Sequence, residues 1–276
     1  MNGSKMNGHT NGSANGVANG AANGVANGAK PSGRTLLVLG AGPGIGRSVT
    51  SLFASHRFGN VVMIARRTEQ LQIEKEVVER IHGVKAGTYA VDITNTKALS
   101  AALNDADAKF GKPEVVFFNA ARVLPSALFE HPVEDIEYDL KVRSSSPMGG
   151  TRQAQNLTSV QINVSALYFI ASRYLPHLSA VAASDPSAKP ALIATSSMLP
   201  HHPMPPYFSL SLVKAAQRNL MQSLHLTYAP QGVHVGVINV GGPVSEEQEV
   251  WNPANIAEKT WNWFDKEGKE SFEVLI

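Results

Sequence analysis

Short apolar runs alternate with amphipathic segments along most of the chain. Apolar runs of this length are typical of buried parallel strands, and apolar residues repeated every three or four positions are typical of helices. Strands are predicted at 35–39, 61–65, 87–91, 114–118, 191–194, 233–240 and 272–276. Helices are predicted at 44–55, 68–81, 96–110 and 209–228, with another apolar helix that contains Asn163 and ends near Pro176. The alternation implies right-handed βαβ units, so we predict one doubly wound α/β domain of about seven parallel strands with helices on both faces of the sheet.

A glycine-rich segment joins the first predicted strand to the first predicted helix. It reads Gly40-Ala41-Gly42-Pro43-Gly44-Ile45-Gly46. Glycines permit a tight turn and let the backbone approach a pyrophosphate, while the start of a helix offers free N–H groups and a positive dipole end. A plain turn is the alternative, but this position in an α/β pattern predicts a dinucleotide site on a Rossmann-type domain.

Two arginines, Arg66 and Arg67, follow the second predicted strand, and Arg66 lies twenty residues beyond Gly46. An acidic residue at this place would accept hydrogen bonds from the ribose 2′-hydroxyl of NAD(H). An arginine instead favours the 2′-phosphate of NADP(H). We therefore predict NADP(H) as the cofactor, and a solvated surface pair is the alternative.

Composition narrows the possible functions. The 276 residues can bury the core of one domain, and a formal net charge of +2 with scattered basic residues does not favour a nucleic-acid partner. The chain has no cysteine, which excludes disulfides, thiol nucleophiles and Cys-ligated zinc, and we predict no metal site. No secretory signal and no apolar stretch of membrane-spanning length is found, so we expect a cytoplasmic protein without a membrane partner.

Two segments differ from the rest of the chain. Residues 1–33 are rich in Asn, Gly and Ala and repeat Asn-Gly every four residues between positions 15 and 26, which predicts a disordered tail. Residues 142–159 are polar, contain glycines and interrupt a predicted helix. This insertion is interpreted as a surface loop or as the product of a retained intron, within a domain that covers residues 34–276.

Several motifs of this domain resemble the short-chain dehydrogenase/reductase family. The positions of Gly40, Gly44, Ile45 and Gly46 resemble its TGxxxGIG turn, with Leu39 in place of threonine. The resemblance implies that these residues bind the cofactor.

Three later motifs extend the resemblance over residues 34–276. Asp92 matches an aspartate that contacts adenine, and Asn119-Ala120-Ala121 resembles the NNAG motif. The segment 241–245 resembles the PGxVxT loop, in which Val244 would contact the nicotinamide amide. The resemblance also implies a homo-oligomer, because the helices around Ser165 and Lys214 form dimer surfaces in this family.

The family's reductase mechanism uses Asn, Ser, Tyr and Lys. Asn163, Ser197 and Lys214 match three of them. The resemblance implies that Ser197 orients a substrate carbonyl, that Asn163 supports a proton relay through water, and that Lys214 holds the ribose and lowers the pKa of the catalytic tyrosine.

The tyrosine itself is displaced. Residues four apart share one face of a helix, and the residue four before Lys214 is Leu210, which cannot transfer a proton. Tyr207 lies seven before Lys214 and follows two prolines, so we expect it at the start of the helix. Either Tyr207 is the acid, or another donor replaces it, or no proton is transferred. The other candidate donors are His201, His202, Ser209, Ser211 and an ordered water.

The sequence thus predicts an NADP(H)-dependent oxidoreductase that moves hydride between nicotinamide and a carbonyl/alcohol pair of a small metabolite. Trp251, Trp261, Trp263 and Phe264 follow the 241–245 loop and either cover an apolar substrate or pack in the core. The alternatives are an NADP(H)-binding protein without ordinary redox turnover, acting as an accessory, sensor or cyclase, and a subunit that assembles with a catalytic partner.

Overall fold

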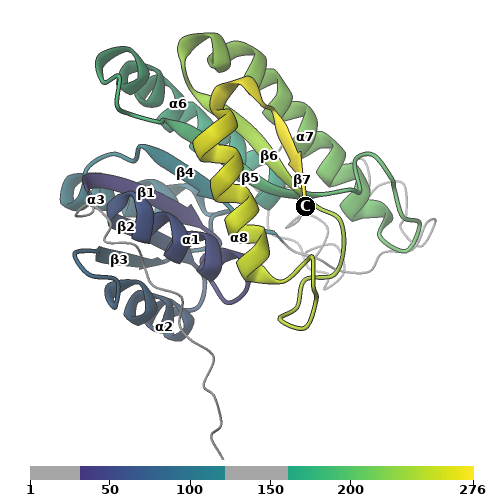
Figure 1. Ribbon diagram of the computed structural model, residues 1–276, viewed down its shortest axis with the longest axis horizontal. Coiled ribbons are helices and arrows are strands. Elements are labelled where there is room, and N and C mark those ends of the chain that lie inside the picture. Colours follow the sequence, from purple (N-terminus) through teal and green to yellow (C-terminus); the bar gives the residue numbers. More distant parts are fainter. Residues whose placement is uncertain (1–31, 122–160) are drawn as a thin grey trace, which may run out of the picture.

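The computed structural model contains one parallel seven-stranded sheet with the strand order β3-β2-β1-β4-β5-β6-β7 (Figure 1). The structure describes residues 32–121 and 161–276. The strands are β1 Ser32–Leu39, β2 Phe58–Ala65, β3 Lys85–Ala90, β4 Val115–Phe118, β5 Ala191–Ser197, β6 His234–Val240 and β7 Glu273–Leu275. This arrangement confirms the predicted α/β fold class. The insertion predicted at 142–159, and residues 1–31 of the predicted tail, lie outside the described residues.

Helices cover both faces of the sheet (Figure 1). They are α1 Ile45–His56, α2 Thr68–Glu79, α3 Thr96–Phe110, α6 Leu167–Ser184, α7 Phe208–Tyr228 and α8 Pro253–Asn262. Buried side chains of α1, α2 and α8 share one core with the sheet, and those of α3, α6 and α7 share the other. A π-helical segment, Gln161–Ala166, leads directly into α6. Among the described helices, none combines the length and the apolar content needed to cross a membrane.

Burial on both faces explains why the strands are continuous apolar runs. In β1, Leu36 and Val38 enter one core and Leu37 and Leu39 enter the other, and none of the four is more than 2% exposed. Removing one such side chain from water stabilises the fold by about 1.5–3 kcal/mol. The same reasoning applies to β4, which is buried throughout.

The aromatic residues near the C-terminal end pack in the core. Trp263 and Phe264 are each 2% exposed. The ring of Phe53 on α1 lies 5.2 Å from that of Phe264 and 5.0 Å from that of Trp261. Trp261, Trp263 and Phe264 therefore pack in the core, as one of the two interpretations predicted, and do not cover a substrate.

Predicted boundaries differ from the structure at several elements, for example at α6 and β1. The helix expected to end near Pro176 continues through it as α6 to Ser184, so that prediction was wrong. Proline removes one N–H donor, whereas the buried face continues on both sides of it with Tyr174 and Leu178. Strand β1 begins at Ser32 rather than at position 35, and the Asn60 side chain donates to the Gly33 carbonyl oxygen at 3.0 Å.

Candidate functional site

The turn between β1 and α1 requires glycine at two positions. Gly40 has φ 86°, and a Cβ there would lie 2.5 Å from the backbone nitrogen of Ala120. At Gly46 a Cβ would lie 2.9 Å from the Gly40 carbonyl oxygen. The N-cap of α1 is Gly44, which provides no side-chain cap. The first N–H groups of α1 are thus free of a side-chain acceptor, as an anion-binding helix start requires.

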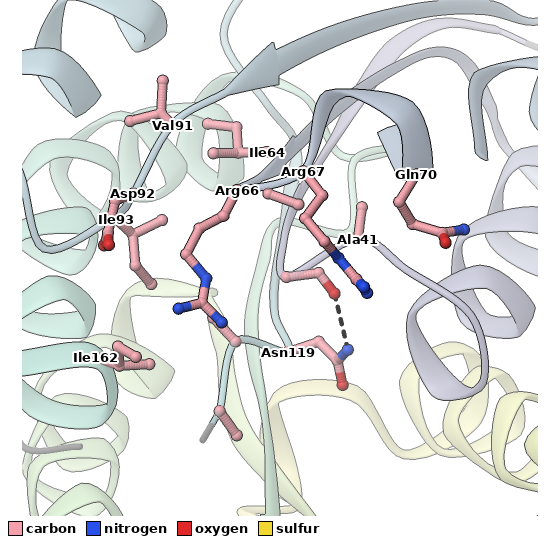
Figure 2. A pocket seen from close by; sticks show the side chains of 14 residues that line it. Ala41, Ile64, Arg66, Arg67, Gln70, Val91, Asp92, Ile93, Asn119 and Ile162 are labelled. Carbon is pink, nitrogen blue, oxygen red and sulfur yellow. Dashed lines mark hydrogen bonds between the residues drawn. The ribbon is translucent and has the colours of Figure 1, made fainter. Parts of the chain in front are cut away.

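A cavity of about 270 Å³ opens beside this turn, at the carboxyl ends of the strands (Figure 2). It lies where the sheet order changes direction between β1 and β4, which is the usual place for a ligand in such sheets. Gly40, Arg66, Asp92 and Asn119, all predicted to bind the cofactor, line it. Residues that sequence reasoning did not single out also line it, among them Gln70 and Ile162.

The charges in the cavity favour an anion. Figure 2 shows the side chains of Arg66 and Arg67 extending from the end of β2 into the cavity. Both are exposed, and neither forms an ion pair among the described residues. The acidic lining residue, Asp92, accepts hydrogen bonds from the backbone nitrogen of Thr94 at 2.9 Å and from its hydroxyl at 2.8 Å. Asp92 therefore fixes the turn before α3, whereas the two guanidinium groups are available to a phosphate.

A third arginine near the turn is already neutralised. Arg47 on α1 donates to both carboxylate oxygens of Glu74, at 2.8 and 2.9 Å, and Gln70 donates to the same carboxylate at 2.7 Å. Glu74 is only 1% exposed. Its hydrogen bonds raise the pKa of Arg47. Glu74 thus holds α1 against α2 and fixes Gln70 at the edge of the cavity.

Asn119 links three strand ends. Its Nδ2 donates to the Gly40 carbonyl oxygen at 3.0 Å, as Figure 2 shows, and its Oδ1 accepts from the Thr195 hydroxyl at 2.8 Å. The side chain therefore holds the glycine turn against the ends of β4 and β5. Its observed contacts therefore shape the cavity.

Lys214 lies buried on α7 against the end of β5. It is 4% exposed, and its Nζ donates to the Thr195 carbonyl oxygen at 3.0 Å and to Gln217 Oε1 at 2.8 Å. Burial lowers its pKa to about 7. Leu210, one turn earlier, lies on the same buried face and is 6% exposed. An apolar side chain therefore lies one turn before Lys214 on this face.

Tyr207 is the N-cap residue of α7, as its position after two prolines predicted. Its backbone nitrogen donates to the Met204 carbonyl oxygen at 2.9 Å. Its own carbonyl oxygen accepts from the backbone nitrogen of Ser211 at 2.8 Å. The side chain is partly buried at the carboxyl edge of the sheet.

The candidate donors differ in what they already bind. The Ser211 hydroxyl donates to the Tyr207 carbonyl oxygen at 2.9 Å, and Nε2 of His201 lies 3.5 Å from Glu273 Oε2. Ser197, at the end of β5, accepts from the Leu199 nitrogen at 3.3 Å and donates to no other described residue. Ser197 is therefore better placed than Ser211 or His201 to donate to a substrate.

The remaining predicted residues surround this edge of the sheet. Asn163 is fully buried in the π-helical segment before α6, which packs against α7. Val244 lies in the loop after β6 and is 39% exposed. The base of that loop is fixed, since the Trp251 indole donates to the Ile276 carbonyl oxygen at 3.0 Å and leaves no room for a Cβ at Gly242. The contact of Val244 with nicotinamide stays a prediction.

These features fit a dinucleotide phosphate. Gly40 and Gly46 leave no room for side chains, and Arg66 and Arg67 have no carboxylate partner among the described residues. Within the same part of the chain, no group of three or more His, Cys, Asp or Glu residues could hold a metal ion.

Comparisons with known proteins agree with this description. A family model described as short chain dehydrogenase matches residues 34–255. A probable 2,4-dienoyl-CoA reductase of Caenorhabditis elegans is 38% identical over 90 residues, which are 32% of this chain and 29% of that protein. The chain thus spans less than a third of the length of that relative. A sorbose reductase of Schizosaccharomyces pombe is 27% identical over 72% of this chain and 69% of its own.

A solved structure shares the fold at greater length. The NADPH-bound short chain oxidoreductase of Pseudomonas aeruginosa PAO1, described as having an atypical catalytic center, superposes with a TM-score of 0.70 at 18% identity. The match covers 90% of this chain and 96% of that one. The family model covers most of the chain, so the protein belongs to the short chain dehydrogenase family.

Proposed function

We propose that the protein is an NADP(H)-dependent oxidoreductase that moves hydride between nicotinamide and a carbonyl/alcohol pair of a small, apolar metabolite. The observation that carries the cofactor preference is the pair Arg66 and Arg67, which enter the cavity without carboxylate partners among the described residues. A 2′-phosphate would neutralise this positive charge, whereas a 2′-hydroxyl would not.

The chain's own residues would hold the cofactor at several points. Backbone N–H groups of the turn at Gly44, Ile45 and Gly46 would bind the pyrophosphate, and Arg66 and Arg67 the 2′-phosphate. Asp92, which lines the cavity, would contact the adenine, and Lys214 would donate to the ribose hydroxyls. Bound NADPH supplies the hydride, and the protein orients the reacting carbon beside it.

Ser197 and Tyr207 are the proposed groups at the substrate oxygen. Ser197 would donate to the carbonyl and polarise it, since its hydroxyl donates to no described residue. Tyr207 would supply the proton that converts the carbonyl to an alcohol, because Leu210 cannot. Asn163 would hold water for a relay toward solvent.

Exposed apolar side chains support an apolar substrate. Met204 in the loop after β5 is 49% exposed, and Val244 and Val250 in the loop after β6 are 39% and 43% exposed. Both loops leave the carboxyl edge of the sheet, where the cofactor cavity opens. A small apolar molecule covered by these side chains would remove them from water.

Calorimetric titration with NADPH and NADH, followed by NADPH oxidation assays with aldehydes and ketones of graded polarity, tests the proposal. We expect tighter binding of NADPH and turnover with apolar carbonyls. Equal affinity for the two cofactors would contradict the proposed preference.

A second candidate function is NADP(H) binding without ordinary redox turnover, in an accessory, sensor or cyclase role. Buried Leu210 favours it, and so do the two protein acceptors that hold Lys214. Tight NADPH binding without consumption of cofactor across the carbonyl panel would favour this candidate.

We also propose self-association through α6 and α7. Tyr168 on α6, and Leu212 and Leu226 on α7, are 62%, 47% and 70% exposed. Burial of such side chains between two copies would stabilise a homo-oligomer. Light scattering during size-exclusion chromatography measures the mass, and a monomer at micromolar concentration would contradict this proposal.

A further inference from the structure

Several buried side-chain atoms lack a hydrogen-bond partner within the described ranges, and three of them lie on β5, β6 and α7. They are Ser196 Oγ, Gln217 Nε2 and Asn239 Oδ1. Their residues are 4%, 0% and 3% exposed. Buried polar atoms in native proteins are nearly always paired with protein or with ordered water. A group of them therefore indicates a bound polar molecule.

The fold places these residues around one space. Ser196 on β5 and Asn239 on β6 are direct register partners on neighbouring parallel strands, so their side chains point to the same face. It is the face of Ala194 and Val237, whose core includes Met221 of α7. Gln217 is one turn before Met221 on the buried side of that helix. The three residues thus meet between β5, β6 and α7.

Glu273 sets the direction of the Asn239 amide. Its carboxylate accepts from Arg218 at 3.1 and 2.9 Å and from Asn239 Nδ2 at 3.1 Å. The hydrogen bonds of Arg218 lower the pKa of Glu273, and His201 lies on its other side at 3.5 Å. Because a carboxylate can only accept, Asn239 must turn its NH₂ toward Glu273. Its Oδ1 then points away from β7, toward Ser196.

Lys214 sets the direction of the Gln217 amide from the opposite end. Its ammonium donates to Gln217 Oε1 at 2.8 Å, so the amide oxygen must face the lysine. The Nε2 donor of Gln217 then points away from Lys214. The Nε2 donor of Gln217 and the Oδ1 acceptor of Asn239 thus both face the space beside Ser196. One water can accept from Gln217 Nε2 and donate to Asn239 Oδ1 and to Ser196 Oγ.

We propose that Ser196, Gln217 and Asn239 hold one ordered water, and that the resulting hydrogen-bond chain from Glu273 fixes the Gln217 amide with its oxygen toward Lys214. Gln217 is then a positioning residue for the lysine. Without the chain, Gln217 Nε2 loses its acceptor, and the amide oxygen is held less firmly toward Lys214. The consequence for cofactor binding rests on the proposed function, whereas the chain itself does not.

A crystal structure of the protein at a resolution that shows ordered water tests the first half of the proposal. We expect one water within hydrogen-bond distance of Ser196 Oγ, Gln217 Nε2 and Asn239 Oδ1. Direct hydrogen bonds among the three side chains, or a space without water, would overturn it.

A titration of Lys214 tests the second half without cofactor or substrate, so its outcome does not depend on the proposed reaction. The protein is labelled with ¹³Cε-lysine, the Lys214 signal is identified by its loss in Lys214→Arg, and its shift is followed against pH. Gln217→Leu removes an acceptor from the ammonium and should lower the pKa of Lys214 by about one pH unit. Gln217→Glu should raise it.

Matched variants keep this test decisive. Gln222→Leu makes the same change on the same helix, where the amide accepts from Arg218 at 3.2 Å and does not reach Lys214. We expect it to leave the Lys214 titration unchanged. Ser196→Ala is the mild variant if Gln217→Leu does not fold, and it should lower the pKa of Lys214 by a smaller amount. Equal titrations of Lys214 in the parent, Ser196→Ala and Gln217→Glu proteins would overturn the proposal.

Discussion

Replacing Arg66 and Arg67 with alanine should weaken the binding of NADPH far more than that of NADH. Both side chains line the cavity, and neither has a carboxylate partner among the described residues. Their removal therefore leaves no protein charge unpaired, and the loss reflects contacts with the 2′-phosphate. The glycine turn, which would bind the pyrophosphate shared by both cofactors, is unchanged.

The expected magnitude follows from the exposure of the two arginines. A hydrogen bond to a charged group contributes about 1.5–3 kcal/mol, and solvent screening at exposed side chains favours the lower end. Each substitution should then weaken NADPH binding about tenfold, and the pair about a hundredfold. NADH should change by less than about threefold. The NADPH effect should also shrink as salt is added, because the contacts are screened.

Isothermal titration calorimetry with both cofactors measures this difference. Arg80→Ala is a suitable control, since Arg80 is the exposed C-cap residue of α2, the helix that follows Arg67, and does not line the cavity. A double variant that loses NADPH and NADH affinity equally, or that loses neither, would refute the assignment of these arginines to the 2′-phosphate.

Four further substitutions test other parts of the account. Glu74→Ala should lower the free energy of unfolding by about 1–3 kcal/mol, measured in urea, because it removes the hydrogen bonds of Arg47 and Gln70, while water still solvates the partly exposed Arg47. Gly40→Ala should abolish NADPH binding or folding, measured by calorimetry and circular dichroism, because a Cβ would lie 2.5 Å from Ala120 N at φ 86°. Tyr207→Phe should reduce kcat at least about a hundredfold with an unchanged NADPH Kd, if Tyr207 is the acid. Burial lowers the pKa of His234 to about 4, so in acid the unfolded chain binds more protons than the folded one. The stability of the parent protein should therefore fall by about 1.4 kcal/mol per pH unit as the pH drops from about 6.5 to about 4. His234→Gln should remove this dependence and flatten the profile of stability against pH.

Each of these substitutions has a control or a contradicting result. Glu76→Ala changes an exposed carboxylate of the same helix and should be nearly neutral. Gly33→Ala meets no atom within 4 Å and should bind NADPH normally. Full activity of Tyr207→Phe would exclude this tyrosine as the acid. An acid profile of His234→Gln identical to that of the parent would show that other groups control stability there.

The fold was predictable because its signals are local. Strands such as β4 are buried on both faces and therefore appear as unbroken apolar runs. The glycine turn was predictable for a similar reason, since the tight approach of Gly40 to Ala120 excludes every side chain. The C-terminal end of α6 was not predictable from local signals, because the packing of residues on both sides of Pro176 lets the helix continue through it.

The site was only partly predictable. Motif spacing correctly predicted that Lys214 lies on a helix and that Tyr207 lies at the start of that helix, but it did not predict the direction of the phenol. The links from Glu74 to Arg47 and from Gln217 to Lys214 escaped prediction for different reasons. The first joins side chains that are 27 residues apart in sequence and lie on two different helices. The second joins neighbours on one helix, yet its importance depends on the burial of both residues between α7 and the sheet.

The central claim is hydride transfer from NADPH. The most direct measurement uses NADPH carrying deuterium at C4, in separate pro-R and pro-S forms, incubated with the protein and a panel of carbonyl compounds, with products analysed by mass spectrometry. We predict deuterium in an alcohol product from one form and not from the other, and its loss in Lys214→Ala. Tight NADPH binding with no deuterium in any product from either form would contradict the account and favour a cofactor-binding role.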